Sequence, residues 1–60
     1  MYIVELRDEL PKFWNGINWT PEPEHAHEYV ERKDALRTAM KLRHIVRFDL
    51  VTKIIVKAIP

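Results

Sequence analysis

The chain has 60 residues, enough for one small domain, and we expect residues 1–60 to fold as that single domain. Apolar residues make up 47% of the sequence and charged residues 32%, a composition that excludes a disordered chain. The absence of cysteine excludes a disulfide framework and a thiolate metal site.

The first segment, residues 2–7, alternates between apolar and polar side chains. This period of two is typical of a strand with one buried side. Tyr2, Val4 and Leu6 are therefore predicted to face a core, whereas Glu5 is predicted to face water.

A turn and a second strand are predicted next. Residues 8–11 end in proline, which fixes φ and disfavours helix in the residue before it, so they predict a turn. Residues 12–14 predict a short strand, and Asn15-Gly16 is a strong signal for a tight hairpin turn. Either the pairing ends there or the chain continues through the turn into residues 17–19, and the sequence leaves both readings open.

One helix is predicted in the middle of the chain. Residues 20–24 contain two prolines and predict a loop, and residues 26–30 predict a brief extended segment leading into the helix. From residue 32 to residue 43 the apolar residues recur at helical spacing on one face. No Ser, Thr, Asn or Asp stands at the start of this helix to cap it.

The last third of the chain is rich in β-branched residues. Segments 45–50 and 53–59 both alternate and predict strands, with Ile54 and Val56 facing the helix. Whether residues 49–52 form a turn between two strands or lie within one irregular strand stays open. The predicted fold class is α+β, a small antiparallel sheet of three or four strands with one helix, about residues 32–43, packed on one face.

Packing positions follow one another in a set order, which is Tyr2-x-Val4, an aromatic residue before Asn15-Gly16, Trp19, Ala26-x-x-Tyr29, Ala35-x-x-x-Ala39 and a β-branched final strand. This order resembles that of many short bacteriophage and prophage proteins of the hairpin–helix–strand type. The resemblance departs from that group at the helix start, where Arg32 and Lys33 stand in place of Ser or Asp, and it implies no site residue. It implies a setting instead, because some of these proteins bind and inhibit host machinery.

The net charge of +1 hides two oppositely charged halves. Residues 1–31 carry two cations and seven acids (net −5), and residues 32–60 carry eight cations and two acids (net +6). Basic residues recur every four positions along the predicted helix and form a basic ridge of Lys33, Arg37 and Lys41 that Arg43 extends. Such a ridge binds an acidic protein face or phosphates. The alternative is a solvated helix face whose charge is balanced by acidic loops folding near it.

A second contact surface is predicted on the open face of the sheet. If Tyr2, Val4 and Leu6 face the helix, Ile3 faces the other way, and so do Ile55 and Lys57 of the last strand. An apolar strip framed by charges is typical of a surface that meets a partner or a second copy. The alternative is that these are isolated surface isoleucines, which are common.

Catalysis and metal binding find little support in the residues. The chain has no serine and no complete catalytic motif, and a domain of this size has little room for a water-excluding pocket, so we expect no enzyme activity. His25 and His27 sit among glutamates at a spacing that places both rings on one side of a strand. A solvated acidic loop is the favoured reading, and no metal or cofactor is expected.

These observations predict a small non-enzymatic protein, phage-derived, that docks on a host or viral protein and modulates or inhibits it. A nucleic-acid-binding module that uses the basic ridge is the first alternative, and a self-associating unit such as a homodimer is the second. The sequence has no signal-peptide pattern and no apolar run long enough to span a bilayer. We therefore expect no membrane association and a cytoplasmic location.

Overall fold

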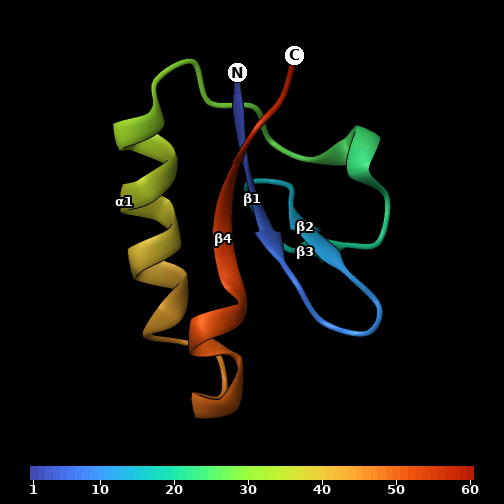
Figure 1. The fold of residues 1–60 in the computed structure, drawn as a ribbon, viewed down its shortest axis with the longest axis vertical. Helices are drawn as coiled ribbons and strands as arrows, with labels where there is room; N and C mark the ends of the chain where they lie inside the picture. Colours follow the sequence, from blue (N-terminus) through green and yellow to red (C-terminus); the bar gives the residue numbers. More distant parts are fainter.

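A central strand, β1 (Tyr2–Leu6), organises the protein, whose computed structural model describes residues 1–60. β4 (Ile54–Ala58) pairs with β1 along one edge, and β2 (Lys12–Trp14) pairs with the other edge. The short β3 (Trp19–Thr20) pairs with β2, which completes an antiparallel sheet in the order β3-β2-β1-β4 (Figure 1).

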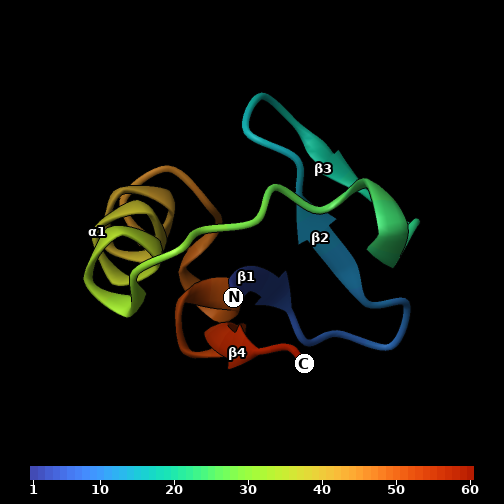
Figure 2. The ribbon, with the colours of Figure 1, turned by 90° about the horizontal axis from the view of Figure 1, so that it is seen from above.

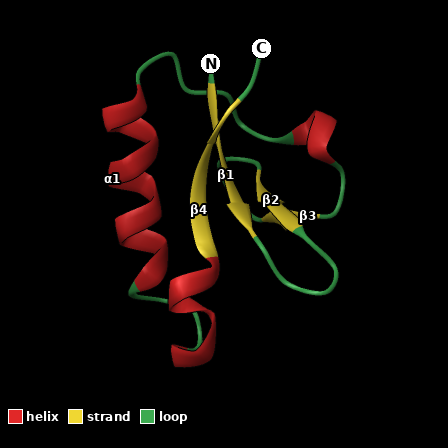
Figure 3. Ribbon diagram, viewed as in Figure 1, coloured by secondary structure: helices red, strands yellow, loops and turns green.

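The helix α1 (Arg32–Arg43) lies against one face of the sheet, where it contacts β1 and β4 (Figure 2). Two 3-10 helices complete the fold: η1 (Pro23–His25) lies on the other side of the sheet, and η2 (Phe48–Lys53) leads directly into β4 (Figure 3). The predicted α+β class is confirmed, with four antiparallel strands and one helix at the predicted bounds. No helix has the length and apolar content needed to cross a membrane.

The core lies between α1 and the two long strands. It consists of six buried residues from these elements: Val4, Leu6, Ala35, Ala39, Leu42 and Ile54. Alanine at two of the three buried helix positions lets the helix backbone approach the sheet closely, while the strands supply the larger side chains. The predicted inward direction of Val4, Leu6 and Ile54 is confirmed.

The hairpin turn after β2 is held by Asn15. Its side-chain Oδ1 accepts hydrogen bonds from the backbone N–H groups of Ile17 (2.8 Å) and Asn18 (2.7 Å). Gly16 has a φ of 101°, a backbone conformation that residues other than glycine rarely adopt. The chain then continues into a further strand at Trp19–Thr20, which resolves the alternative left open by the sequence.

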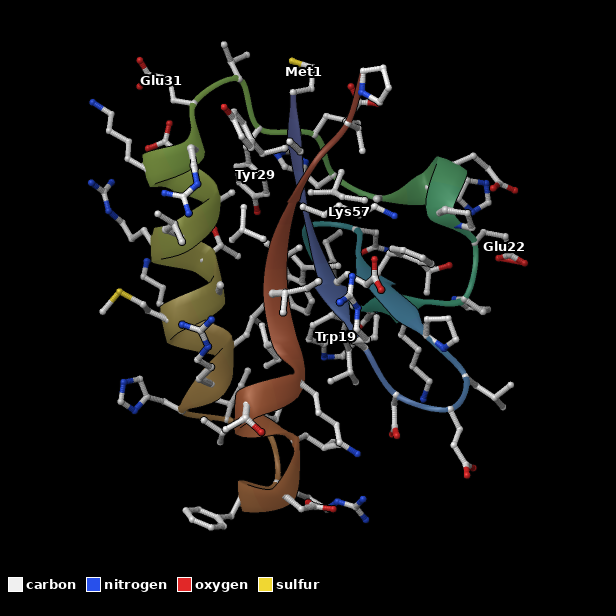
Figure 4. All side chains as sticks on the ribbon, viewed as in Figure 1. Met1, Trp19, Glu22, Tyr29, Glu31 and Lys57 are labelled. Carbon is white, nitrogen blue, oxygen red and sulfur yellow. The ribbon has the colours of Figure 1, made fainter.

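The segment between η1 and α1 crosses from one side of the sheet to the other (Figure 2). On its way it pairs with the start of β1, since the N–H of Tyr29 donates to the Tyr2 carbonyl and the N–H of Tyr2 donates to the Tyr29 carbonyl, both at 2.8 Å. Figure 4 shows Tyr29 between the start of α1 and β1. The predicted extended segment at residues 26–30 is confirmed at this bridge.

The start of α1 has no side-chain cap, as the sequence predicts. Glu31 occupies the N-cap position in an extended conformation and makes no capping hydrogen bond with its side chain. At the other end the chain keeps turning, because the N–H groups of Ile45 and Val46 both donate to the Leu42 carbonyl at 3.1 Å.

The predicted strand at residues 45–50 is wrong. These residues form the turn after α1 and the beginning of η2. The chain must reverse between α1 and the antiparallel β4, and it does so by partly burying Val46 and Leu50 against the core while Phe48 points into solvent. This packing overrides the β-propensity of the segment.

The predicted exposure of Ile3 and Glu5 is also wrong. Ile3 is 5% exposed and Glu5 is 7% exposed, although both lie on the face away from α1. Phe13, the register partner of Glu5, is buried on the same face, and η1 contacts β2 on that side. The second face of β1 is therefore covered, and β1 is buried on both sides.

Core burial predicts how two isoleucines differ in their contribution to stability. Ile54 is 1% exposed and Ile45 is 75% exposed. Ile54→Val should lower the free energy of unfolding by about 0.5–1.5 kcal/mol because it leaves a small cavity. Ile45→Val, the matched control, should change it by less than about 0.5 kcal/mol. Urea denaturation followed by tryptophan fluorescence measures both, and equal effects would contradict this placement of the core.

Candidate functional site

The basic ridge lies along the exposed side of α1, where helical spacing places Lys33, Arg37 and Lys41. Lys33 Nζ lies 3.4 Å from the Glu31 carboxylate. Arg37 lies 3.8 Å from the carboxylate of Asp34, one turn back on the same helix. Lys41 has no ion pair, so it is the ridge cation most available to a partner.

Arg43 differs from the other ridge residues. Its guanidinium is half-buried and donates a 2.8 Å hydrogen bond to the backbone carbonyl of Ile54, at the start of β4. A charged donor to a carbonyl fixes the end of the helix against the strand. Arg43 thus serves the fold, and the solvent-facing part of the ridge ends at Lys41.

Three large apolar side chains are exposed near the C-terminal end of α1. Met40 is in the helix, Ile45 follows it, and Phe48 begins η2 with 94% of its surface exposed. We group them with the two basic residues beside them in the sequence and call these five residues the α1–η2 surface: Met40, Lys41, Ile45, Arg47 and Phe48. Figure 1 shows that η2 projects beyond the ends of α1 and of the sheet.

The sequence pattern does not predict the exposure of Ile45 and Phe48. Strand alternation over residues 45–50 places Val46, Phe48 and Leu50 on one buried side, but only Val46 and Leu50 pack against the core. The one feature of the sequence that could have indicated an exposed Phe48 is its position between two charged residues, Arg47 and Asp49. In the structure these two side chains pair at 3.3 Å.

The acidic residues of the first half do not gather around the ridge. Glu22 and Glu24 lie at η1, on the side of the sheet away from α1 (Figures 2 and 4). Only Glu31 among the acids of residues 1–31 pairs with the ridge. The fold therefore keeps the basic helix and the acidic residues of η1 on opposite sides of the sheet.

The predicted apolar strip on the open sheet face does not form as an exposed surface. Ile3 is buried and Ile55 is half-buried, and of the three predicted residues only Lys57 is exposed. Lys57 points away from α1 (Figure 4), with its Nζ 3.8 Å from the buried Glu5 carboxylate. Arg7 Nε lies 3.7 Å from the same carboxylate. The two cations compensate a carboxylate that would otherwise be buried without a partner charge.

The two histidines make different contacts. His25 Nδ1 is 3.9 Å from the Glu22 carboxylate, whereas the His27 ring packs edge-on against Tyr29 with a centroid distance of 4.6 Å. The structure brings no group of three His, Cys, Asp or Glu side chains together, and it contains no pocket.

The two tryptophans pack at the rim of the core. Trp14 and Trp19 are register partners in β2 and β3, and their rings meet edge-on with centroids 5.4 Å apart. Both rings are half-buried against the core cluster, so the two tryptophans contribute to the packing of the fold.

Comparison of the chain with protein-family models, with curated proteins and with solved structures finds no match.

One carboxyl group has a clearly shifted pKa. The pKa of Asp8 lies below its ordinary value of 3.8, first because the backbone N–H of Glu9 donates to its carboxylate at 2.9 Å. The second cause is Lys53, whose Nζ donates to the same oxygen at 3.3 Å. A lowered folded-state pKa stabilises the fold at pH values above the unfolded pKa, and this contribution is lost as the pH falls through the folded pKa.

An NMR titration of the Asp8 carboxyl should therefore give a midpoint below 3.8. Lys53→Ala should raise that midpoint toward 3.8, without reaching it, because the Glu9 N–H remains. Lys12→Ala is a control, since Lys12 has no ion pair and is not among the causes of the shift. An unchanged midpoint in Lys53→Ala would show that the Asp8–Lys53 contact does not persist in solution.

Proposed function

We propose that this protein is a small binding domain without chemistry of its own, which docks on an acidic surface of a protein partner through the α1–η2 surface. The observation that carries the proposal is Phe48, a large aromatic side chain held 94% exposed at a projecting end of the molecule. A phenylalanine left in water contributes no buried apolar surface, although a domain of this size needs such burial for stability. A partner that covers Phe48 would bury that surface.

The composition of the α1–η2 surface favours a protein as the partner. Aromatic residues, methionine and arginine are the types enriched at protein interfaces, and Phe48, Met40 and Arg47 supply one of each. Lys41, which has no ion pair within its own chain, favours an acidic partner, because opposite charges steer association and fix orientation.

Nucleic acid is the alternative that the basic ridge supports. Phosphate contacts come from Lys and Arg and need no exposed aliphatic side chain beside them. On α1 two of the three ridge cations already lie near an acid of their own chain, and the exposed Met40 and Ile45 would gain nothing from a phosphate backbone. The protein-binding hypothesis therefore explains more of the exposed residues of the α1–η2 surface.

The setting that we propose follows from the resemblance to small phage proteins. A phage-encoded protein of this kind acts in the host cytoplasm, where it binds a host or viral protein and modulates or inhibits it. The separation of the basic helix from the acidic residues of η1 supports a specific orientation on such a partner.

Affinity capture with a matched pair of variants tests the apolar part of the surface. Phe48→Ala should abolish recovery of a stoichiometric protein partner from bacterial lysate, whereas Leu10→Ala should leave it unchanged. Both side chains are almost fully exposed, so neither variant should alter the fold. A partner retained equally by both variants, or no partner for the unmodified protein, would contradict the proposal.

Two lysines provide the matching test of charge. Lys12 and Lys41 are both exposed and neither has an ion pair, but only Lys41 belongs to the α1–η2 surface. Lys41→Glu should weaken partner binding about tenfold, and Lys12→Glu should change it little. Binding kinetics of each variant at low and moderate salt measure the difference.

Two further outcomes separate the alternatives. Duplex or single-stranded nucleic acid bound with a steep salt dependence, lost in an Arg37→Glu, Lys41→Glu double variant but retained in Phe48→Ala, would replace the protein partner with nucleic acid. Sedimentation as a dimer that dissociates in Phe48→Ala would replace it with a second copy.

A further inference from the structure

β4 is an edge strand of the sheet, with β1 on one side and no strand on the other (Figure 2). Antiparallel strands exchange hydrogen bonds through alternate residues. The Lys53 carbonyl accepts from the Arg7 N–H and the Ile59 N–H donates to the Met1 carbonyl, both at 2.8 Å. These bonds place the odd-numbered residues of this segment in the ladder with β1.

The backbone groups of the even-numbered residues of β4, which are Ile54, Val56 and Ala58, therefore point away from the sheet. The Ile54 carbonyl accepts the Arg43 guanidinium at 2.8 Å, which agrees with this direction. The N–H and C=O groups of Val56 and Ala58 bond to no other backbone group outside the sheet. An unpaired strand edge of this kind is a template for a further strand.

The side chains around this edge are apolar and basic. Ile55 and Val56 are half-buried, and Lys53 and Lys57 lie on either side of Ile55 on the face away from α1. On the other face lies α1, which carries five cations and one acid. On the face away from α1, Lys53 pairs with Asp8 at 3.3 Å, whereas Lys57 and Arg7 share the single carboxylate of Glu5. That face therefore keeps an excess positive charge beside β4.

We propose that the outer edge of β4 accepts an extended acidic segment of the partner protein as a fifth strand of the sheet. The backbone groups of Val56 and Ala58 pair with the segment. Its apolar residues lie beside Ile55 and Val56, and its acidic residues face Lys57 on the face away from α1. This inference rests on the proposed protein-binding function and specifies one mode of that binding.

Charge complementarity selects this occupant over a second copy. Two copies joined antiparallel through β4 would place both α1 helices on the same face of one continuous sheet. Each helix carries a net charge of +4 from its residues, so the two would repel. An acidic segment experiences attraction at the same place.

Amide hydrogen exchange of the free protein tests the premise. The N–H groups of Ile55 and Lys57 should exchange slowly, and those of Val56 and Ala58 should exchange fast. A synthetic peptide of alternating valine and glutamate is then added as the probe, with the peptide of alternating valine and lysine as its charge control. The acidic peptide should slow exchange at Val56 and Ala58, and the basic peptide should not.

Ala58→Pro removes the outward N–H without removing any bond to β1. Proline is accepted at edge positions whose N–H faces solvent, and Ala58 is exposed, so the variant should fold. It should bind the acidic peptide about tenfold more weakly, because it loses one of the pairing groups. Ala58→Val keeps the N–H and should bind as the unmodified protein does.

Three results would overturn the inference: fast exchange at all four amides of the free protein, failure of the acidic peptide to bind, or equal binding of the peptide by Ala58→Pro. A fourth is protection at Val56 and Ala58 that rises with protein concentration alone, because it would mean that a second copy occupies the edge. If Ala58→Pro leaves Phe48-dependent capture of a partner intact, the β4 inference fails while the proposed function stands. If Phe48→Ala has no effect on capture but the acidic peptide still protects β4, docking through the α1–η2 surface fails while strand addition at β4 stands.

Discussion

The structure depends on the double burial of β1. This one strand pairs with β4 along its whole length, with β2 over its second half and with Tyr29 at its start. One of its faces packs under α1 and the other is covered by neighbouring side chains on the η1 side of the sheet. A chain of 60 residues has little apolar surface to spare, and using both faces of the central strand makes the most of it.

The same economy explains where the exposed apolar residues lie. The two faces of β1 are already occupied, so no further side of the sheet is available to the residues after α1. Val46 and Leu50 reach the core from the turn, and Ile45 and Phe48 do not. The exposed apolar residues of the α1–η2 surface thus result from the chain reversal between helix and strand. Its basic residues belong to the second half of the chain, which carries the excess of cations.

Local patterns in the sequence were sufficient for the elements that have one regularly spaced apolar side. Alternation placed β1 and β4, and helical spacing placed α1 at its observed bounds, because in each case the regularly spaced apolar residues mark the side that faces the core between helix and sheet. The burial of Ile3 and Glu5 could not be predicted this way, because alternation says nothing about what covers the second face. Segment 45–50 failed for a related reason: β-branched composition records local preference, whereas a chain reversal is set by the elements on either side.

The candidate site shows the same division. The spacing of Lys33, Arg37 and Lys41 follows from the helix alone, but the structural role of Arg43 depends on a carbonyl eleven residues away. The exposure of Phe48 depends on the path of the turn. Which backbone groups of β4 point outward depends on the hydrogen-bond phase between β1 and β4, and no side-chain pattern records that phase.

The bond between the Ile59 N–H and the Met1 carbonyl brings the two ends of the chain together at the end of the molecule opposite η2 (Figure 1). The backbone therefore traces a nearly closed loop. A short peptide joining Met1 and Pro60 would close this loop with little strain and would reduce the conformational entropy of the unfolded chain. For the same reason the unit can be inserted into a surface loop of a larger protein, with its projecting end still directed outward.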